Sequence, residues 1–127
     1  MPQLNIFFVE DNTMVRESLF AALEERVDVC MAGFADSANE AIDKLVRDAQ
    51  ACDLAIIDVM LREGSGVEVL KALQRADRPL KRVMLTNYPV PLLRDHCLAL
   101  GADRVFDKSR DFEELLDYCG ALATEPR

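Results

Sequence analysis

The sequence lacks the features that mark membrane, secreted and nucleic-acid-binding proteins. No apolar stretch approaches the roughly 18 residues that a membrane-spanning helix needs. The N-terminus has no basic segment followed by a long apolar one, so we expect no signal peptide. The formal net charge of −8 argues against direct contact with nucleic acid, which favours a basic surface. We therefore expect a cytoplasmic protein with no membrane partner and no nucleic-acid partner.

Cysteine and histidine ligands for a soft metal are also scarce. The four cysteines, Cys30, Cys52, Cys97 and Cys119, show no CxxC spacing, and His96 is the only histidine. We expect the cysteines to be buried, reduced thiols, because disulfides are rare in the cytoplasm. His96 is expected on the surface or partly packed, with no catalytic role.

What the chain does contain is five short apolar runs that alternate with helix-like segments. The runs are rich in Val, Ile and Phe, which is typical of buried parallel strands, and they lie at 4–9, 27–34, 54–57, 82–85 and 104–107. A strand–helix repeat predicts a parallel sheet with helices on both faces. We expect an α/β, flavodoxin-like, doubly wound five-stranded sheet with strand order 2-1-3-4-5. No linker or low-complexity segment interrupts it, so residues 1–127 are expected to form one domain.

Polar residues suggest where several helices begin. Asn12 is expected to cap the first helix, and Ser109 the last. Ser37, with Glu40 three residues later, has the signature of a capping box for the second helix. The apolar spacing places further side chains in the core, among them Val15, Phe34, Leu92 and Phe112.

Five polar residues lie at the ends of four of these runs: Glu10, Asp11, Asp58, Thr86 and Lys108. In the order 2-1-3-4-5, the four strands concerned are consecutive neighbours. Their carboxyl ends share one edge of the sheet, where α/β proteins bind ligands. We therefore expect the five side chains to converge, while Asp36, after the second strand, is expected to lie out of reach.

These residue types suit a divalent cation and a phosphoryl group. Three carboxylates at close quarters repel one another unless a cation lies between them, and Mg²⁺ prefers oxygen ligands. Asp58 is the best candidate nucleophile, because it is the single acid on the central strand, and a carboxylate nucleophile yields an acyl phosphate. The ammonium of Lys108 can neutralise phosphoryl charge, and the hydroxyl of Thr86 can donate to a phosphoryl oxygen.

At these positions the chain resembles the receiver domains of bacterial two-component response regulators, in particular a stand-alone, chemotaxis-regulator-like member. The resemblance covers essentially the whole chain, and further agreement comes from the glycine-bearing segment 58–66 and from Gly101-Ala102-Asp103. It implies that Asp58 accepts a phosphoryl group from a sensor histidine kinase or a phosphotransfer protein. It also implies a Mg²⁺ ion, for which Mn²⁺ can substitute, held by Glu10, Asp11, Asp58 and the backbone carbonyl of Met60.

The resemblance further implies how the signal is read. Thr86 and Lys108 are expected to contact the phosphoryl oxygens, while Met60 and Tyr88 tune the access of water. Phosphorylation is expected to rearrange loop 86–91 and the surface of the fourth helix, fifth strand and fifth helix, which contacts a downstream protein. Onward relay to a second histidine is the alternative. We expect no enzyme activity beyond phosphorylation and dephosphorylation of Asp58 itself.

The chain departs from the family pattern at three positions. Val105 stands where the family usually has the Tyr or Phe that follows the movement of the threonine, and the neighbouring Phe106 should point to the opposite face. Ser109 follows Lys108 where the family often has a cis proline, so a trans bond is expected. Arg62 replaces a common proline.

Two other functions compete with a phosphorylated receiver. A metal-dependent phosphohydrolase of the haloacid dehalogenase type also uses a strand-end aspartate, but its DxD pattern after the first strand and its cap domain are missing here. A receiver-shaped adaptor that is never phosphorylated should lack a site residue, and none is missing. Val105 is the one feature that favours the adaptor.

Overall fold

Five parallel strands form the middle layer of the molecule, which is described here over residues 3–125 of a computed structural model. The strands are β1 (Leu4–Val9), β2 (Val29–Ala35), β3 (Leu54–Asp58), β4 (Lys81–Thr86) and β5 (Arg104–Asp107). Their order in the sheet is β2-β1-β3-β4-β5, and every neighbouring pair is parallel. The predicted fold class and strand order are confirmed.

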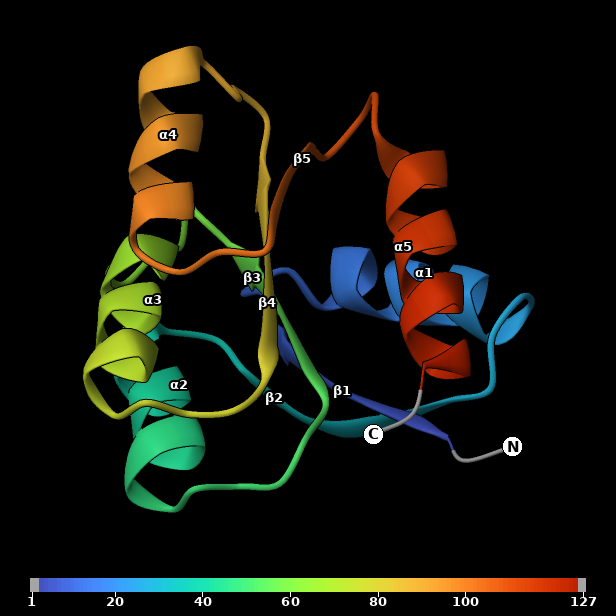
Figure 1. Cartoon of the computed structure of the whole chain (residues 1–127), viewed down its shortest axis with the longest axis horizontal. Coiled ribbons are helices and arrows are strands. Elements are labelled where there is room, and N and C mark those ends of the chain that lie inside the picture. The colour runs from blue at the N-terminus through green and yellow to red at the C-terminus, as the bar shows by residue number, and fades with distance from the viewer. Residues whose placement is uncertain (1–2, 126–127) are drawn as a thin grey trace.

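Helices cover both faces of this sheet (Figure 1). They are α1 (Thr13–Glu24), α2 (Ala38–Ile42) with a π-helical turn η1 (Asp43–Arg47), α3 (Gly66–Arg75), α4 (Pro91–Ala99) and α5 (Phe112–Thr124). In Figure 1, α1 and α5 lie on one side of the strands, and α2, α3 and α4 lie on the other. Successive strand side chains point to opposite faces, so Phe8 belongs to the core under α1 and α5, and Phe7 to the core under α2 and α3.

Asn12 caps α1 as predicted, whereas the prediction for the second helix is only partly right. Ser37 accepts a hydrogen bond from the backbone N–H of Glu40, but the Glu40 carboxylate pairs with Lys44, so the capping box is incomplete. The complete capping box is at α3, where Ser65 accepts from Val67 and Glu68 accepts from the backbone N–H of Ser65.

The prediction that Ser109 caps the last helix is wrong. The cap position of α5 is Asp111, and the Ser109 hydroxyl donates to the carboxylate of Asp107 instead, at 2.9 Å. The same carboxylate accepts from the backbone N–H groups of Ser109 and Arg110. The turn after β5 thus places the Ser109 hydroxyl against Asp107, ahead of the first residue of α5, so it does not cap that helix.

Four side chains predicted in the core are exposed instead. Leu92 is 82% exposed, because the side of α4 that packs against the core carries Leu93 and Cys97 instead. Phe34 is 39% exposed, because its ring lies under the guanidinium of Arg16 rather than under apolar groups. Val15 and Phe112 line a pocket between α1 and α5, which leaves both partly open to solvent.

All four cysteines are free thiols. Cys97 and Cys119 are buried as expected, whereas Cys30 and Cys52 are only half-buried. Burial raises the pKa of Cys52 to about 11 and that of Cys119 to about 12, so both thiols stay protonated and unreactive at neutral pH. Over residues 3–125, no helix has the length and apolarity needed to cross a membrane.

Candidate functional site

Three carboxylates meet at the carboxyl edge of the sheet. Glu10 follows β1 directly and Asp58 is the last residue of β3, and both side chains are buried because the strands that carry them are central. Asp11 lies half-buried on the turn into α1. One oxygen from each of the three residues lies within 4.8 Å of the others. The predicted convergence of these three side chains is observed.

The ammonium of Lys108 lies between two of these carboxylates. Its Nζ atom donates to Oε1 of Glu10 at 2.9 Å and to Oδ2 of Asp58 at 2.8 Å, and its side chain is 19% exposed. Burial lowers the pKa of Lys108, but the hydrogen bonds and negative charges of Asp58 and Glu10 together raise it above its ordinary value. Lys108 is therefore charged at neutral pH and offsets part of the negative charge at this edge.

The other carboxylate oxygens are held by backbone N–H groups. Asn12 donates to Oε2 of Glu10, Met60 donates to Oδ1 of Asp58, and Arg62 donates to Oδ2 of Asp11. Burial raises the pKa of Glu10, and the hydrogen bonds from Lys108 and Asn12 oppose that rise. The turns after β1 and β3 thus hold the three carboxylates in place.

This donor set fits a small divalent cation. Carboxylate oxygens are the ligands that Mg²⁺ takes, at about 2.1 Å from the metal, which puts ligand oxygens on opposite sides of the ion about 4 Å apart. The oxygens of Glu10, Asp11 and Asp58 already lie within 4.8 Å of one another, so a small inward movement brings all three into range. Cysteine and histidine play no part in this cluster, so a hard cation is favoured.

Thr86 and Tyr88 lie at the end of β4, beside this edge. Thr86 is buried, and its hydroxyl oxygen accepts a hydrogen bond from the backbone N–H of Tyr88. Tyr88 is 73% exposed, so its ring is not packed into the core. The phosphoryl contact expected of Thr86 and the tuning role expected of Tyr88 remain predictions.

The departures from the family pattern have clear structural consequences. Val105 is buried among the side chains under α3 and α4, while Phe106 belongs to the core on the opposite face, as strand alternation predicted. An aliphatic group therefore fills the place of the usual aromatic ring. No cis peptide bond occurs in residues 3–125, so the bond between Lys108 and Ser109 is trans.

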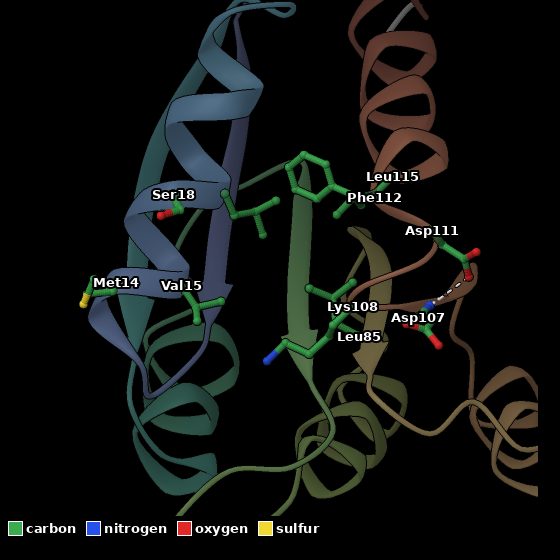
Figure 2. A pocket seen from close by; sticks show the side chains of 10 residues that line it. Met14, Val15, Ser18, Leu85, Asp107, Lys108, Asp111, Phe112 and Leu115 are labelled. Carbon is green, nitrogen blue, oxygen red and sulfur yellow. Dashed lines mark hydrogen bonds between the residues drawn. The ribbon is translucent and has the colours of Figure 1, made fainter.

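An apolar pocket of about 290 Å³ opens beside Lys108, between α1 and α5. Figure 2 shows Phe112 reaching into it from α5, facing Val15 on α1, with Lys108 along its lower wall. Asp107 and Asp111 lie at one side and are joined by the hydrogen bond drawn there. Lys108 lines this pocket and also donates to two residues of the carboxylate cluster, Glu10 and Asp58.

Arg16 is a site residue that the sequence did not indicate. Its guanidinium donates to the backbone carbonyl oxygen of Glu10 at 2.8 Å and to Asp36 at 3.2 Å. Asp36 lies outside the carboxylate cluster, as expected, but Arg16 connects it to Glu10. A cation in the first turn of a helix is unfavourable for the helix dipole, and this was the one available signal.

Known proteins with similar sequences are response regulators. The family model described as "Response regulator receiver domain" matches residues 6–119. The DNA-binding transcriptional activator DevR/DosR of Mycobacterium tuberculosis is 31% identical over 85 residues, which are 67% of this chain and 38% of that protein. The acid tolerance regulatory protein ActR of Rhizobium meliloti is 26% identical over 117 residues, which are 91% of this chain and 57% of ActR. The chain thus spans less than two thirds of these relatives.

Solved structures give the same result for the fold. The signal receiver domain of the response regulator NarL from Mycobacterium tuberculosis superposes with a TM-score of 0.85 at 20% identity, covering 99% of this chain and 100% of that one. A chain of the CheX–CheY–BeF₃–Mg²⁺ complex from Borrelia burgdorferi gives a TM-score of 0.83 at 17% identity, covering 96% of this chain and 90% of that one. With the family match over nearly its whole length, the chain belongs to the response regulator receiver family.

Proposed function

We propose that this chain is a phosphoacceptor receiver, and that Asp58 takes a phosphoryl group from a phosphohistidine in a reaction that depends on Mg²⁺. One observation supports this most strongly: oxygens of three carboxylates from the ends of β1 and β3 lie within 4.8 Å of one another, and the ammonium at the end of β5 donates to two of these carboxylates. Such a cluster is costly to bury and stabilises no core, so it is best explained by a ligand with both a cation and phosphoryl oxygens.

In the proposed transfer, a carboxylate oxygen of Asp58 attacks the phosphorus of the donor. The new P–O bond forms as the P–N bond breaks, and the imidazole nitrogen keeps the electron pair, gains a proton and leaves as histidine. A water molecule later attacks the same phosphorus, which releases phosphate and restores the Asp58 carboxylate. Neither step places a covalent bond on any residue of this chain other than Asp58.

The remaining residues of the site handle charge. A divalent cation, when bound by Glu10, Asp11, Asp58 and the carbonyl of Met60, supplies positive charge to the phosphoryl oxygens. Lys108 already contacts Oδ2 of Asp58, so its ammonium lies where it can contact the added phosphoryl oxygens. Thr86 is assigned the role of hydroxyl donor to a phosphoryl oxygen. Met60 is 71% exposed beside Asp58 and, with Tyr88, is assigned the control of water access.

We assign the signalling contact to the surface formed by α4, β5 and α5. Phosphorylation adds about −1.5 to −2 charge units next to Thr86 and the loop 86–91. At the start of α4, Val90 is 54% exposed and Leu92 is 82% exposed, and both line a shallow apolar groove with Leu93 and His96. Apolar side chains held open to solvent favour a protein partner there. Onward transfer to a second histidine is the alternative use of the same phosphoryl group.

The test is incubation of the purified chain with Mg²⁺ and acetyl phosphate, followed by intact-mass measurement. We expect a mass increase of one phosphoryl group that is stable in acid and labile in base. Asp58→Asn should abolish it, because an amide is not a nucleophile for this step, while Asp48→Asn, a matched change at an exposed position outside the cluster, should retain it. A label that survives Asp58→Asn would refute the assignment, and steady turnover of a phosphate ester would indicate a hydrolase instead.

A further inference from the structure

The buried cation Arg16 is not explained by the proposed phosphoryl chemistry. Five polar or charged residues are buried among those the structure describes: Glu10, Arg16, Asp58, Thr86 and Asp107. Of these, Arg16 is the only cation, and its side chain is 7% exposed. Burying a guanidinium is costly, and in the first turn of α1 the helix dipole also disfavours it. Such a placement needs a compensating role.

Arg16 contacts the backbone of one site residue and is held there by side chains. Its Nη1 atom donates to the carbonyl oxygen of Glu10 at 2.8 Å and to Oδ1 of Asp36 at 3.2 Å. The ring of Phe34 lies against the other side, with the guanidinium carbon 3.9 Å from the ring centroid. The guanidinium is thus held between the end of β2 and the end of β1.

We infer that Arg16 is a positioning residue for the binding of the divalent cation. It does not contact the cation but acts on it through the backbone of Glu10. The Glu10 carbonyl belongs to the peptide group that joins Glu10 to Asp11, so fixing this oxygen fixes the direction in which both carboxylates leave the chain. Asp36 and Phe34 hold the guanidinium in turn. Groups that orient metal ligands from outside the coordination sphere commonly affect metal affinity about 10- to 100-fold. This inference rests on the proposed function, since it concerns the same cation.

A positioning role and a simple charge effect predict opposite results. If Arg16 acted only through its positive charge, replacing it by a neutral residue would remove repulsion and tighten cation binding. If it positions Glu10 and Asp11, the same replacement loosens binding. Phe34 carries no charge, so a change there tests positioning alone.

The experiment measures Mn²⁺ affinity by titration with electron paramagnetic resonance, at a temperature where circular dichroism shows each variant folded. We expect Arg16→Gln to weaken Mn²⁺ binding about tenfold. Arg16→Lys, which keeps the charge but loses the planar fork, and Phe34→Leu should weaken binding in the same direction. Arg26→Gln removes an equal charge from an exposed ion pair with Glu113 and should leave the affinity within about twofold.

A second control separates positioning from general loss of stability. Leu116→Ala creates a cavity in the core under α5, away from the carboxylates. It should lower stability while leaving Mn²⁺ affinity unchanged. Mn²⁺ binding to Arg16→Gln that equals or exceeds wild type would overturn the inference. Should that variant not fold, unchanged binding by Phe34→Leu would overturn it equally. A wild-type chain that binds no Mn²⁺ would overturn the proposed function, and the inference with it.

Discussion

At the scale of single residues, the site is a balance between buried negative charge and one lysine. Glu10 and Asp58 are both nearly enclosed, and Lys108 donates to each of them. This shared arrangement raises the pKa of both groups. Burial is the main cause of the raised pKa of Glu10, whereas the hydrogen bonds and charges of Glu10 and Asp58 together outweigh burial and raise the pKa of Lys108. Lys108 therefore takes part of the charge-neutralising role that a divalent cation would also fill.

Removing the ammonium should make folding depend on added metal. Lys108→Met leaves two buried carboxylates without their counter-ion and should cost about 1.5–3 kcal/mol in metal-free buffer, the usual value of a hydrogen bond to a charged group. Added Mg²⁺ should restore more stability to this variant than to wild type, because the cation replaces the lost charge. Urea unfolding with EDTA and with Mg²⁺ measures both effects.

The exposed ion pair of Lys81 with Asp103 supplies the control for this change. Its atoms are 4.0 Å apart and the lysine side chain is 53% exposed, so Lys81→Met should cost under about 1 kcal/mol with no dependence on Mg²⁺. An equal gain from Mg²⁺ in all three proteins would contradict the account of Lys108.

Alkaline pH should remove the contribution of Lys108. Its pKa is raised above the ordinary 10.5, so above that pH the folded chain holds a proton that the unfolded chain has lost, and stability falls as pH rises. The contribution is fully present below about pH 10.5 and is lost as the pH passes the folded pKa. Urea unfolding in this range should show a steeper loss for wild type than for Lys108→Met.

Comparison with the variant is needed because other groups titrate in the same range. Burial raises the pKa of Tyr118 and that of Cys119 to about 12, and both affect wild type and variant alike. Parallel pH curves for the two proteins would show that the lysine adds nothing in the folded state.

At the scale of elements, the loop from β3 to α3 connects the first turn of α3 to Asp58, the proposed phosphoryl site. Gly66 opens α3, and a Cβ atom there would collide with the backbone oxygen of Asp58. Ser65 donates to the carbonyl of Val59 and accepts from Val67, so the start of α3 is joined to the residue that follows the proposed phosphoacceptor Asp58. The position of Asp58 therefore depends on how well this helix begins.

The two candidate cap serines should differ in their effect on stability. Ser65→Ala removes a complete capping box and should lower the free energy of unfolding by about 1 kcal/mol. Ser109→Ala removes one half-exposed hydrogen bond to Asp107 that caps no helix, and should cost less. Urea unfolding of both variants makes the comparison, and an equal or larger loss at Ser109 would contradict the assignment of the caps.

Elements and their order were predictable, whereas contacts between distant segments were not. Short Val- and Ile-rich runs at regular intervals determine a parallel sheet, and the order of strands then determines that Glu10, Asp58 and Lys108 meet. Whether Leu92 is buried depends on how α4 packs against the sheet, which the local spacing of apolar residues does not encode. Likewise, the stacking of Arg16 on Phe34 joins two segments that share no sequence pattern.

At the scale of the whole molecule, the sheet separates two layers that serve the site differently. The layer of α1 and α5 carries Arg16 and the pocket beside Lys108, and the layer of α2, α3 and α4 holds Val105 and the exposed start of α4. In the proposed function, a signal from Asp58 reaches the α4 surface by way of β4 and β5, where Val105 is buried. We therefore expect the aliphatic side chain of Val105, rather than an aromatic ring, to take part in this transmission.

The most direct measurement is peptide-level mass spectrometry after incubation with acetyl phosphate, with Mg²⁺ in one sample and EDTA in the other. The account predicts one phosphoryl group, carried by the peptide that contains Asp58 and formed only in the sample with Mg²⁺. A phosphoryl group on any other residue, or equal labelling of Asp58 in EDTA, would contradict it.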